Sequence, residues 1–258
     1  MSSSGEQAVL LARRSVVRTY RQPANVVFPL VFPLLLLAVN SGGLHSATLL
    51  PGFPTTSFVA FALAIPFIQG ALFATMNAGT DLARDIQTGF LNRLSLTPMR
   101  APVLLAGQLG GVAVMGIIQA LVYIVVGLIA GVHFESGPLG IGVLLLFAVI
   151  VSIGFGALGA FAALRTGSSE AVQGLFPLFF VFLFISSMNM PRNLIAVDWF
   201  RTAATLNPVS YLIEAVRSLI ILGWDGQALA LGFGIAGTIM VVSLVLASVS
   251  LRTRLTRS

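Results

Sequence analysis

The sequence predicts an all-α membrane protein with six transmembrane helices. Its composition is 57% hydrophobic and only 9% charged, with a mean hydropathy of +1.00, which does not describe a water-soluble surface. The few charges also leave long uncharged stretches between them, and about 20 residues suffice for one helix to cross a bilayer. We therefore interpret the chain as a series of membrane spans bounded by charges.

The positions of the spans follow from the charges, because an Asp, Lys or Arg at the centre of a membrane helix costs about 2.5 to 3.5 kcal/mol on insertion scales. Only the first uncharged stretch, residues 22–80, is long enough for two crossings, and the Asn, Ser, Gly and Pro residues in its middle predict a loop. Each later stretch holds one. The expected spans of this single transmembrane domain (1–258) are residues 24–40, 57–79, 103–130, 139–163, 171–190 and 227–250.

The arginines predict the orientation. An even number of spans places both termini on one side, and if that side is cytoplasmic, only Arg192, Arg201 and Arg217 of the 14 arginines lie outside. This distribution satisfies the positive-inside rule. All basic residues are arginine, which favours a GC-rich bacterial source, so we expect a bacterial plasma membrane protein with cytoplasmic termini. The long charged leader without an A-x-A site argues against a cleaved signal peptide.

Residues 5–22 predict an amphipathic helix on the inner membrane surface, before the first span. Arg14, Arg18 and Arg21 recur at i, i+4 and i+7, and apolar residues keep similar spacing on another side. We expect these arginines to contact anionic lipid headgroups, at about 1 kcal/mol each. A plain solvated leader is the alternative that this loose periodicity leaves open.

The segment from Thr80 to Arg100 carries an apolar stripe on the cytoplasmic side. Gly89 should weaken a helix here and Pro98 should end it, so we expect two short helical pieces. The stripe either docks on a partner or rests on lipid headgroups, and the pattern leaves both open. Its residues recur every four positions: Leu82, Ile86, Phe90 and Leu94.

Residues 191–225 hold six charges and face outside by the span count. The pair Asn207-Pro208 is typical of a helix start, with Asn as the cap and Pro at the first helical position. Tyr211, Glu214 and Arg217 then step by three along an otherwise apolar helix, which should dip into the membrane edge or pack on the spans. We expect Glu214 and Arg217 to pair there, and an ordinary interfacial pair is the alternative.

Several kinds of chemistry lack the residues they need. No G-x-x-x-x-G-K-[ST] phosphate loop occurs, so this chain is not expected to hydrolyse ATP. Cysteine is absent, the two histidines lie at loop ends, and the spans hold no carboxylate cluster, so neither a metal centre nor an intramembrane protease is predicted. The net charge of +6 is explained by membrane orientation, and no nucleic-acid partner is expected.

The spans contain amides and phenylalanines but no ions. Aromatic residues at helical spacing suit a large, flat or greasy cargo, although contact with lipid is the commoner explanation of such residues. The glycines at 107–111 and 154–159 should let helices approach closely. The candidate cargo path consists of Phe67, Gln69, Phe73, Asn77, Phe176, Phe180 and Phe184.

Two motifs carry a resemblance to a known family. The stretch D-I-Q-T-G-F-L-N-R-L-S-L-T-P from Asp85 to Pro98 is followed far downstream by L-N-P-V-S-Y-L-I-E-A-V-R from Leu206 to Arg217. In this order the pair resembles the ATP-binding-cassette type-2 exporter permeases, above all membrane subunits of the daunorubicin-resistance kind. The likeness covers nearly the whole chain.

The resemblance implies partners and site residues. It makes the segment after the second span, residues 80–100, a coupling helix that docks on a separate cytosolic ATPase. Two ATPase copies, which bind ATP and Mg, would serve two six-span permeases, identical or similar, while this chain binds no cofactor itself. The implied coupling residues are Asp85, Thr88, Gly89, Phe90, Leu91, Arg93, Leu94, Thr97 and Pro98. The implied re-entrant extracellular cap, within residues 191–225, consists of Asn207, Pro208, Tyr211, Glu214 and Arg217.

These expectations combine into one functional hypothesis. The chain is the permease subunit of an ATP-driven exporter that moves an amphipathic drug or lipid out of the cytoplasm or the inner leaflet. A polysaccharide exporter is one alternative, although its route should be lined by more polar side chains than these spans supply. A non-transporting membrane scaffold or an intramembrane enzyme is the alternative from another class.

Overall fold

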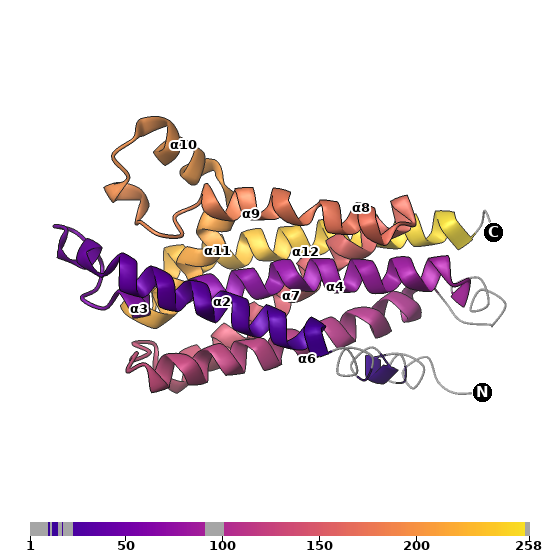
Figure 1. Cartoon of the computed structure of the whole chain (residues 1–258), viewed down its shortest axis with the longest axis horizontal. Coiled ribbons are helices and arrows are strands. Elements are labelled where there is room, and N and C mark those ends of the chain that lie inside the picture. The colour runs from indigo at the N-terminus through magenta and orange to yellow at the C-terminus, as the bar shows by residue number, and fades with distance from the viewer. Residues whose placement is uncertain (1–9, 11, 15–16, 18–22, 91–100, 256–258) are drawn as a thin grey trace.

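The computed structural model describes residues 10, 12–14, 17, 23–90 and 101–255, and its regular elements over those ranges are all helices (Figure 1). Within them, five helical segments are long and apolar enough to cross a membrane, and there are up to six if one bent helix pair counts as a span. The five are α2 (Pro23–Gly43), α3 with α4 (Phe58–Ala62 and Ala64–Gln87), α6 (Ala101–Ile129), α7 (Gly137–Thr166) and α12 (Gly226–Leu255). The predicted all-α membrane class is confirmed.

The two ends of the bundle are held by contacts between segments far apart in the sequence. The end of the bundle where α4 and α12 finish is here called the inner end (Figure 1). There the Gln87 side chain donates to the Gly167 carbonyl at 3.3 Å. At the opposite, outer end, the Glu135 amide donates to the Ile220 carbonyl at 3.1 Å. Short elements gather at the outer end: η1 (His45–Leu49), η2 (Arg192–Leu194), α10 (Asp198–Leu206), α11 (Pro208–Arg217) and the π-helical turn η3 (Ser218–Leu222).

Helix α2 keeps its two internal prolines because neighbouring helices satisfy the carbonyls that they free. Proline has no N–H, so Pro29 and Pro33 each remove the helical hydrogen bond to the carbonyl four residues earlier. The Asn77 amide donates to the Asn25 carbonyl at 3.3 Å, and the Tyr123 hydroxyl donates to the Pro29 carbonyl at 2.8 Å. This is how backbone groups are expected to be satisfied inside a bilayer.

The expected fifth span, 171–190, is not one continuous helix. The chain forms α8 (Ser169–Gly174) and α9 (Phe176–Phe184), which together are shorter than a spanning helix, and the segment 185–190 is irregular. Two residues explain the break: Gly174 is a weak helix former, and Pro177 cannot donate to the carbonyl of Gln173. The boundary was wrong because an uncharged stretch measures hydrophobic length and does not show where a helix is interrupted.

The second span differs in the opposite sense, because α4 is longer than the predicted segment 57–79. It continues to Gln87 at the inner end, and its outer end is separated from α3 by a turn at Leu63. Pro66 accounts for this turn, since its missing N–H leaves the Ala62 carbonyl without a helical donor. One helix therefore runs from the outer end of the bundle into the segment predicted to couple.

Helix α7 packs most extensively on α4 and α12, and its glycines make that packing possible. A Cβ atom added at Gly159 would lie 2.0 Å from the Thr75 carbonyl oxygen of α4, and one added at Gly154 would lie 3.1 Å from the Met240 Cα of α12. The predicted close approach at the 154–159 glycines is confirmed. Helices α4, α7 and α12 thus pack nearly backbone to backbone.

Candidate functional site

The coupling segment begins as the last turns of α4. The helix ends at Gln87 with Thr88 as its C-cap, and Gly89 follows with φ of +69°, a left-handed conformation that glycine adopts without strain. Of the residues implied to couple, Asp85, Thr88, Gly89 and Phe90 lie within the described part of the chain. The others lie outside the described residues: Leu91, Arg93, Leu94, Thr97 and Pro98.

Arg14 joins the leader to this segment. Its guanidinium lies 3.2 Å from the Asp85 carboxylate and 3.9 Å from the centroid of the Phe90 ring, so it makes an ion pair and a cation–π contact at once. Arg14 therefore contacts protein, although its side chain remains 42% exposed, and its predicted contact with lipid headgroups stays a prediction. The predicted headgroup contacts of Arg18 and Arg21 lie outside the described residues.

An aromatic cluster connects α2, α4 and α9 and extends from the core to the surface of the bundle. Phe73 and Phe176 have ring centroids 5.1 Å apart, and Phe176 and Phe180 are 4.7 Å apart, so three of the predicted cargo residues meet. Phe28 and Phe32 of α2 complete the cluster at 5.5 and 6.1 Å from Phe73. The sequence prediction did not include these two, although they are four residues apart in α2 and their ring centroids lie 5.3 Å from each other.

Phe184 lies at the edge of this cluster, with its ring centroid 6.2 Å from that of Phe180. The other three predicted cargo residues do not join the cluster. Phe67 packs on Tyr123 at 5.5 Å, and Phe184 is 54% exposed near the end of α9. The Asn77 side chain donates a hydrogen bond to the Asn25 carbonyl, as described above. Gln69 is fully buried in α4, and neither atom of its amide has a hydrogen-bond partner. The seven residues therefore do not form one continuous path.

A small crevice between α4 and α6 brings Asn77 of the predicted cargo path together with polar side chains outside that path. It is lined by Asn77 and Asp81 of α4 and by Gln108 and Gln119 of α6, with small and apolar residues between them. The Gln108 amide donates to the Ala78 carbonyl at 3.3 Å. Within the described residues, no group of three or more His, Cys, Asp or Glu side chains could hold a metal ion.

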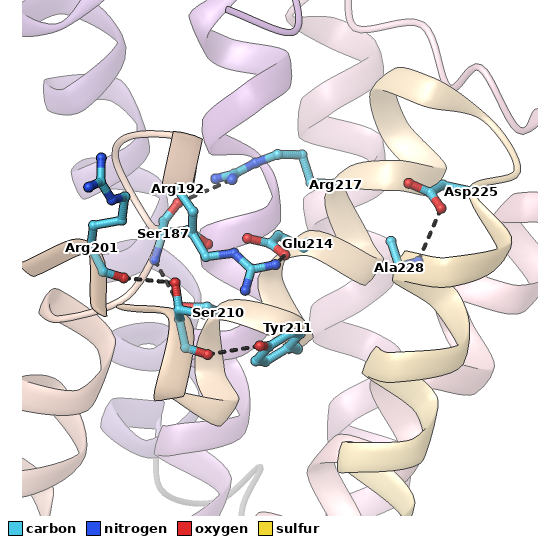
Figure 2. A network of polar contacts seen from close by, with 10 residues as sticks. Ser187, Arg192, Arg201, Ser210, Tyr211, Glu214, Arg217, Asp225 and Ala228 are labelled. Carbon is cyan, nitrogen blue, oxygen red and sulfur yellow. Dashed lines mark hydrogen bonds and ion pairs between the residues drawn. The ribbon is translucent and has the colours of Figure 1, made fainter. Parts of the chain in front are cut away.

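The outer cap, residues 185–225, contains α10 and α11 with η3, and the two helical arms meet at an angle of 80°. Asn207 makes the bend. Its side-chain oxygen accepts from the Val209 amide at 2.9 Å, and its amide nitrogen donates to the Ile185 carbonyl at 3.0 Å beyond α9. Helix α11 begins at Pro208, as the Asn-Pro pair predicts. Tyr211 donates to the Thr205 carbonyl at 2.8 Å and steadies the same corner (Figure 2).

The expected pair of Glu214 and Arg217 is wrong. Glu214 makes its ion pair with Arg192 at 2.5 Å, and the guanidinium of Arg192 also lies 4.5 Å from the Tyr211 ring centroid (Figure 2). Arg217 instead points away from α11 and donates to three backbone carbonyls, those of Phe61, Ser187 and Met188, at 3.0 to 3.1 Å. Helical spacing placed Glu214 and Arg217 near each other, but it gave no sign of Arg192, which is 22 residues away.

A partly open cavity of about 400 Å³ lies against this network. Asp225, on its wall, caps α12 by accepting from the backbone amides of Gln227 and Ala228 (Figure 2). Arg192, Arg217 and Glu214 also line the cavity, together with apolar side chains such as Phe61 and Ile221. The cavity thus combines polar and apolar walls at the outer end.

A double-mutant cycle separates the two possible partners of Glu214. We expect a coupling free energy of about 1 kcal/mol between R192A and E214A, because the pair is charge-assisted but both side chains keep some solvent contact. The matched cycle of E214A with R217A should show a smaller coupling. Thermal unfolding of the purified protein in detergent measures both, and equal coupling in the two cycles would contradict the observed pairing.

Known transport permeases are similar to this chain over most of its length. The chain matches the family described as ABC-2 type transporter over residues 6–221. It is 29% identical to a daunorubicin resistance ABC transporter permease protein of Streptomyces coeruleorubidus, over 87% of this chain and 74% of that protein. It is 26% identical to a probable doxorubicin resistance ABC transporter permease protein of Mycobacterium tuberculosis, over 82% of this chain and 75% of that protein. A putative transport permease of Porphyra purpurea is 27% identical over 80% of this chain and 71% of its own length.

Proposed function

Because this chain belongs to the ABC-2 type transporter family, we propose that it is the membrane subunit of an ATP-driven exporter that moves an amphipathic drug or lipid outward. Two of the similar permeases carry daunorubicin or doxorubicin resistance in their names. The cargo leaves from the cytoplasm or the inner leaflet, and the exporter resides in a bacterial plasma membrane with both termini in the cytoplasm. The excess of arginines on the inner side supports this orientation.

The continuity of α4 carries the proposal. The α3–α4 segment contributes the Phe61 carbonyl to the outer cap, and α4 itself ends beside the Arg14 contact with Asp85 and Phe90. It also packs nearly backbone to backbone on α7 through Gly159. A push applied at the inner end is therefore transmitted along one helix to the outer end as a rigid-body movement, and not lost in a flexible loop.

The push comes from a separate cytosolic ATPase subunit. Two copies of it bind ATP and Mg and close on each other, and each docks on the coupling segment of one permease, so two identical or similar permeases enclose the cargo. The Arg14 contact supports this role for the segment, because it fixes Phe90 against the leader. Outward transport requires that the inward-open form binds the cargo more tightly than the outward-open form does.

The aromatic cluster is the part of the interior best suited to an amphipathic cargo. Phe28 is 51% exposed while its neighbour Phe73 is fully buried, so the cluster reaches from the core of the subunit to its surface. Aromatic faces bind flat or apolar groups without demanding a fixed hydrogen-bond pattern. The cluster lies where α2 and α9 meet, so a cargo between two permeases would contact it from the subunit surface.

Copurification with the ATPase tests the proposed function. The tagged chain, coexpressed with a candidate ABC ATPase subunit, should retain that subunit in mild detergent, and the complex in proteoliposomes should hydrolyse ATP faster when an amphipathic cargo such as daunorubicin is added. A chain that never retains an ATPase would exclude the transporter role. If the ATPase is retained but the cargo does not stimulate its hydrolysis of ATP, the chain is still a transporter subunit, and this class of cargo is rejected.

A further inference from the structure

Arg217 is the point at which three separate segments of the outer end meet. From the end of α11, its Nε donates to the Phe61 carbonyl of α3 at 3.1 Å. Its two Nη atoms donate to the Ser187 and Met188 carbonyls, at 3.1 and 3.0 Å, in the irregular segment after α9 (Figure 2). The guanidinium carbon also lies 3.5 Å from the Phe61 ring centroid. One side chain, 6% exposed, thus holds α3, α11 and the segment 185–190 together.

The three carbonyls lie where regular helix is interrupted. Phe61 precedes the turn at Leu63, and Ser187 and Met188 follow the end of α9. Such carbonyls cost several kcal/mol each if they are left without a donor in the membrane. Arg217 supplies donors to all of them from a single fork of N–H groups. Arg217 therefore supplies the hydrogen-bond donors that these backbone carbonyls lack where the helices are interrupted.

The charge of Arg217 is held without an ion pair to any described residue. The nearby carboxylate of Glu214 is engaged by Arg192, so carbonyl dipoles and the Phe61 ring are the direct contacts of the guanidinium. This differs from a buried ion pair, whose separation leaves two opposite charges uncompensated. Opening the Arg217 contacts exposes one guanidinium and three carbonyls, all of which water can hydrate. The cavity of about 400 Å³ that Arg217 lines provides room for that water.

We propose that Arg217 is a positioning residue that acts as a releasable clasp of the outer end, closed in the inward-facing state and opened when ATP drives cargo outward. This inference rests on the proposed function, since it assigns a gate to the same transport cycle. The opening separates α3 and the segment 185–190 from α11, at the α3–α4 turn and the π-helical turn η3 that already interrupt the helices there. The clasp Arg217 thus connects the movement of α4 to the opening of the cavity.

A single introduced cysteine reports the state of the clasp, because the chain contains none. Ser187 is fully buried, and its hydroxyl has no hydrogen-bond partner among the described residues, so S187C replaces a side chain that makes no polar contact with them. Its backbone carbonyl remains available to Arg217. The control is S46C, on the exposed element η1 at the same end. Both variants are reconstituted with the ATPase in proteoliposomes and treated from the outer side with a membrane-impermeant maleimide.

The expected result has two arms. With Arg217 intact, S187C reacts slowly without nucleotide, and a non-hydrolysable ATP analogue speeds the reaction about tenfold or more, as when a minor open state becomes dominant. In R217K/S187C, without nucleotide and without the ATPase, the reaction is already fast, because an ammonium cannot donate to the three carbonyls in the fork geometry of a guanidinium. S46C reacts at one rate throughout.

The outcomes separate a clasp from a merely structural arginine. If R217K speeds labelling but nucleotide never does in the native background, Arg217 only stabilises the fold and the clasp is rejected. Protection of S187C in every state, with S46C reactive, also overturns it. If R217K does not elute as a monodisperse protein, F61L takes its place, since it removes the ring beneath the guanidinium and keeps the carbonyl. If the ATPase does not copurify, the proposed function itself is rejected. The labelling of R217K/S187C without nucleotide can still be compared with that of S187C, because it does not require the ATPase.

Discussion

Replacing Phe90 with aspartate is expected to abolish docking of the ATPase subunit while the membrane helices remain folded. Phe90 follows the left-handed Gly89 at the end of α4, and the guanidinium carbon of Arg14 lies 3.9 Å from the centroid of the Phe90 ring. An aspartate there removes the aromatic surface and sets a second carboxylate beside Asp85. Both changes act at the inner end, away from the helix packing.

The loss should be large because aromatic side chains dominate binding energy at interfaces. Removing such an anchor costs about 2 to 4 kcal/mol, which is roughly a 30- to 700-fold weaker association. The introduced charge adds to this loss, since it must be desolvated in the docked complex. Association measured by pull-down of the ATPase, and ATP hydrolysis by the reconstituted complex, should both fall to background.

Two further variants identify which property of Phe90 matters. F90L keeps an apolar side chain and should retain most of the association if the ATPase contacts an apolar surface. R14A removes both the ion pair with Asp85 and the contact with the ring, so it should weaken coupling by a smaller factor. Unchanged cargo-stimulated hydrolysis in F90D would show that the segment rests on lipid and does not dock.

The fold was predictable from the sequence as far as the cost of charges in a bilayer decides it. That cost located the spans now seen as α6, α7 and α12, because charged residues lie at both of their ends. Helix α2 was separated from the second span by the loop residues in the uncharged stretch 22–80. The cost of charges could not locate the break at Leu175 or the extension of α4 to Gln87. Both depend on backbone hydrogen bonds, such as the one that Pro177 cannot make, and charge patterns carry no information about them.

The candidate sites were predictable where the signal is local. The Asn207-Pro208 pair placed the start of α11, and the repeats of phenylalanine placed three members of the aromatic cluster. Contacts between distant segments were not predictable, since one sequence contains no record of them. Arg14 and Asp85 are 71 residues apart, and Arg217 reaches the Phe61 carbonyl over 156 residues. The outer clasp therefore became visible only in three dimensions.

Replacing Gly159 with alanine is expected to destabilise the bundle and to reduce coupling, because α4 and α7 leave no room for a methyl group. The added Cβ would lie 2.0 Å from the Thr75 carbonyl oxygen, which belongs to the backbone of α4 and cannot rotate away. Overpacking typically costs about 1 to 3 kcal/mol, and a contact with backbone belongs at the upper end of that range. The helices must separate to relieve it.

Gly142→Ala is the matched control, since Gly142 lies on the same helix and an added Cβ there meets nothing within 4 Å. Alanine is the better helix former by about 1 kcal/mol, so G142A should leave thermal stability unchanged or slightly raised while G159A lowers it. The functional consequence follows from the same contact. If α4 moves α7 as a rigid body, G159A should also reduce cargo export per ATP hydrolysed in proteoliposomes. A variant that loses stability but exports at the native ratio would show that force reaches the outer end through α4 alone.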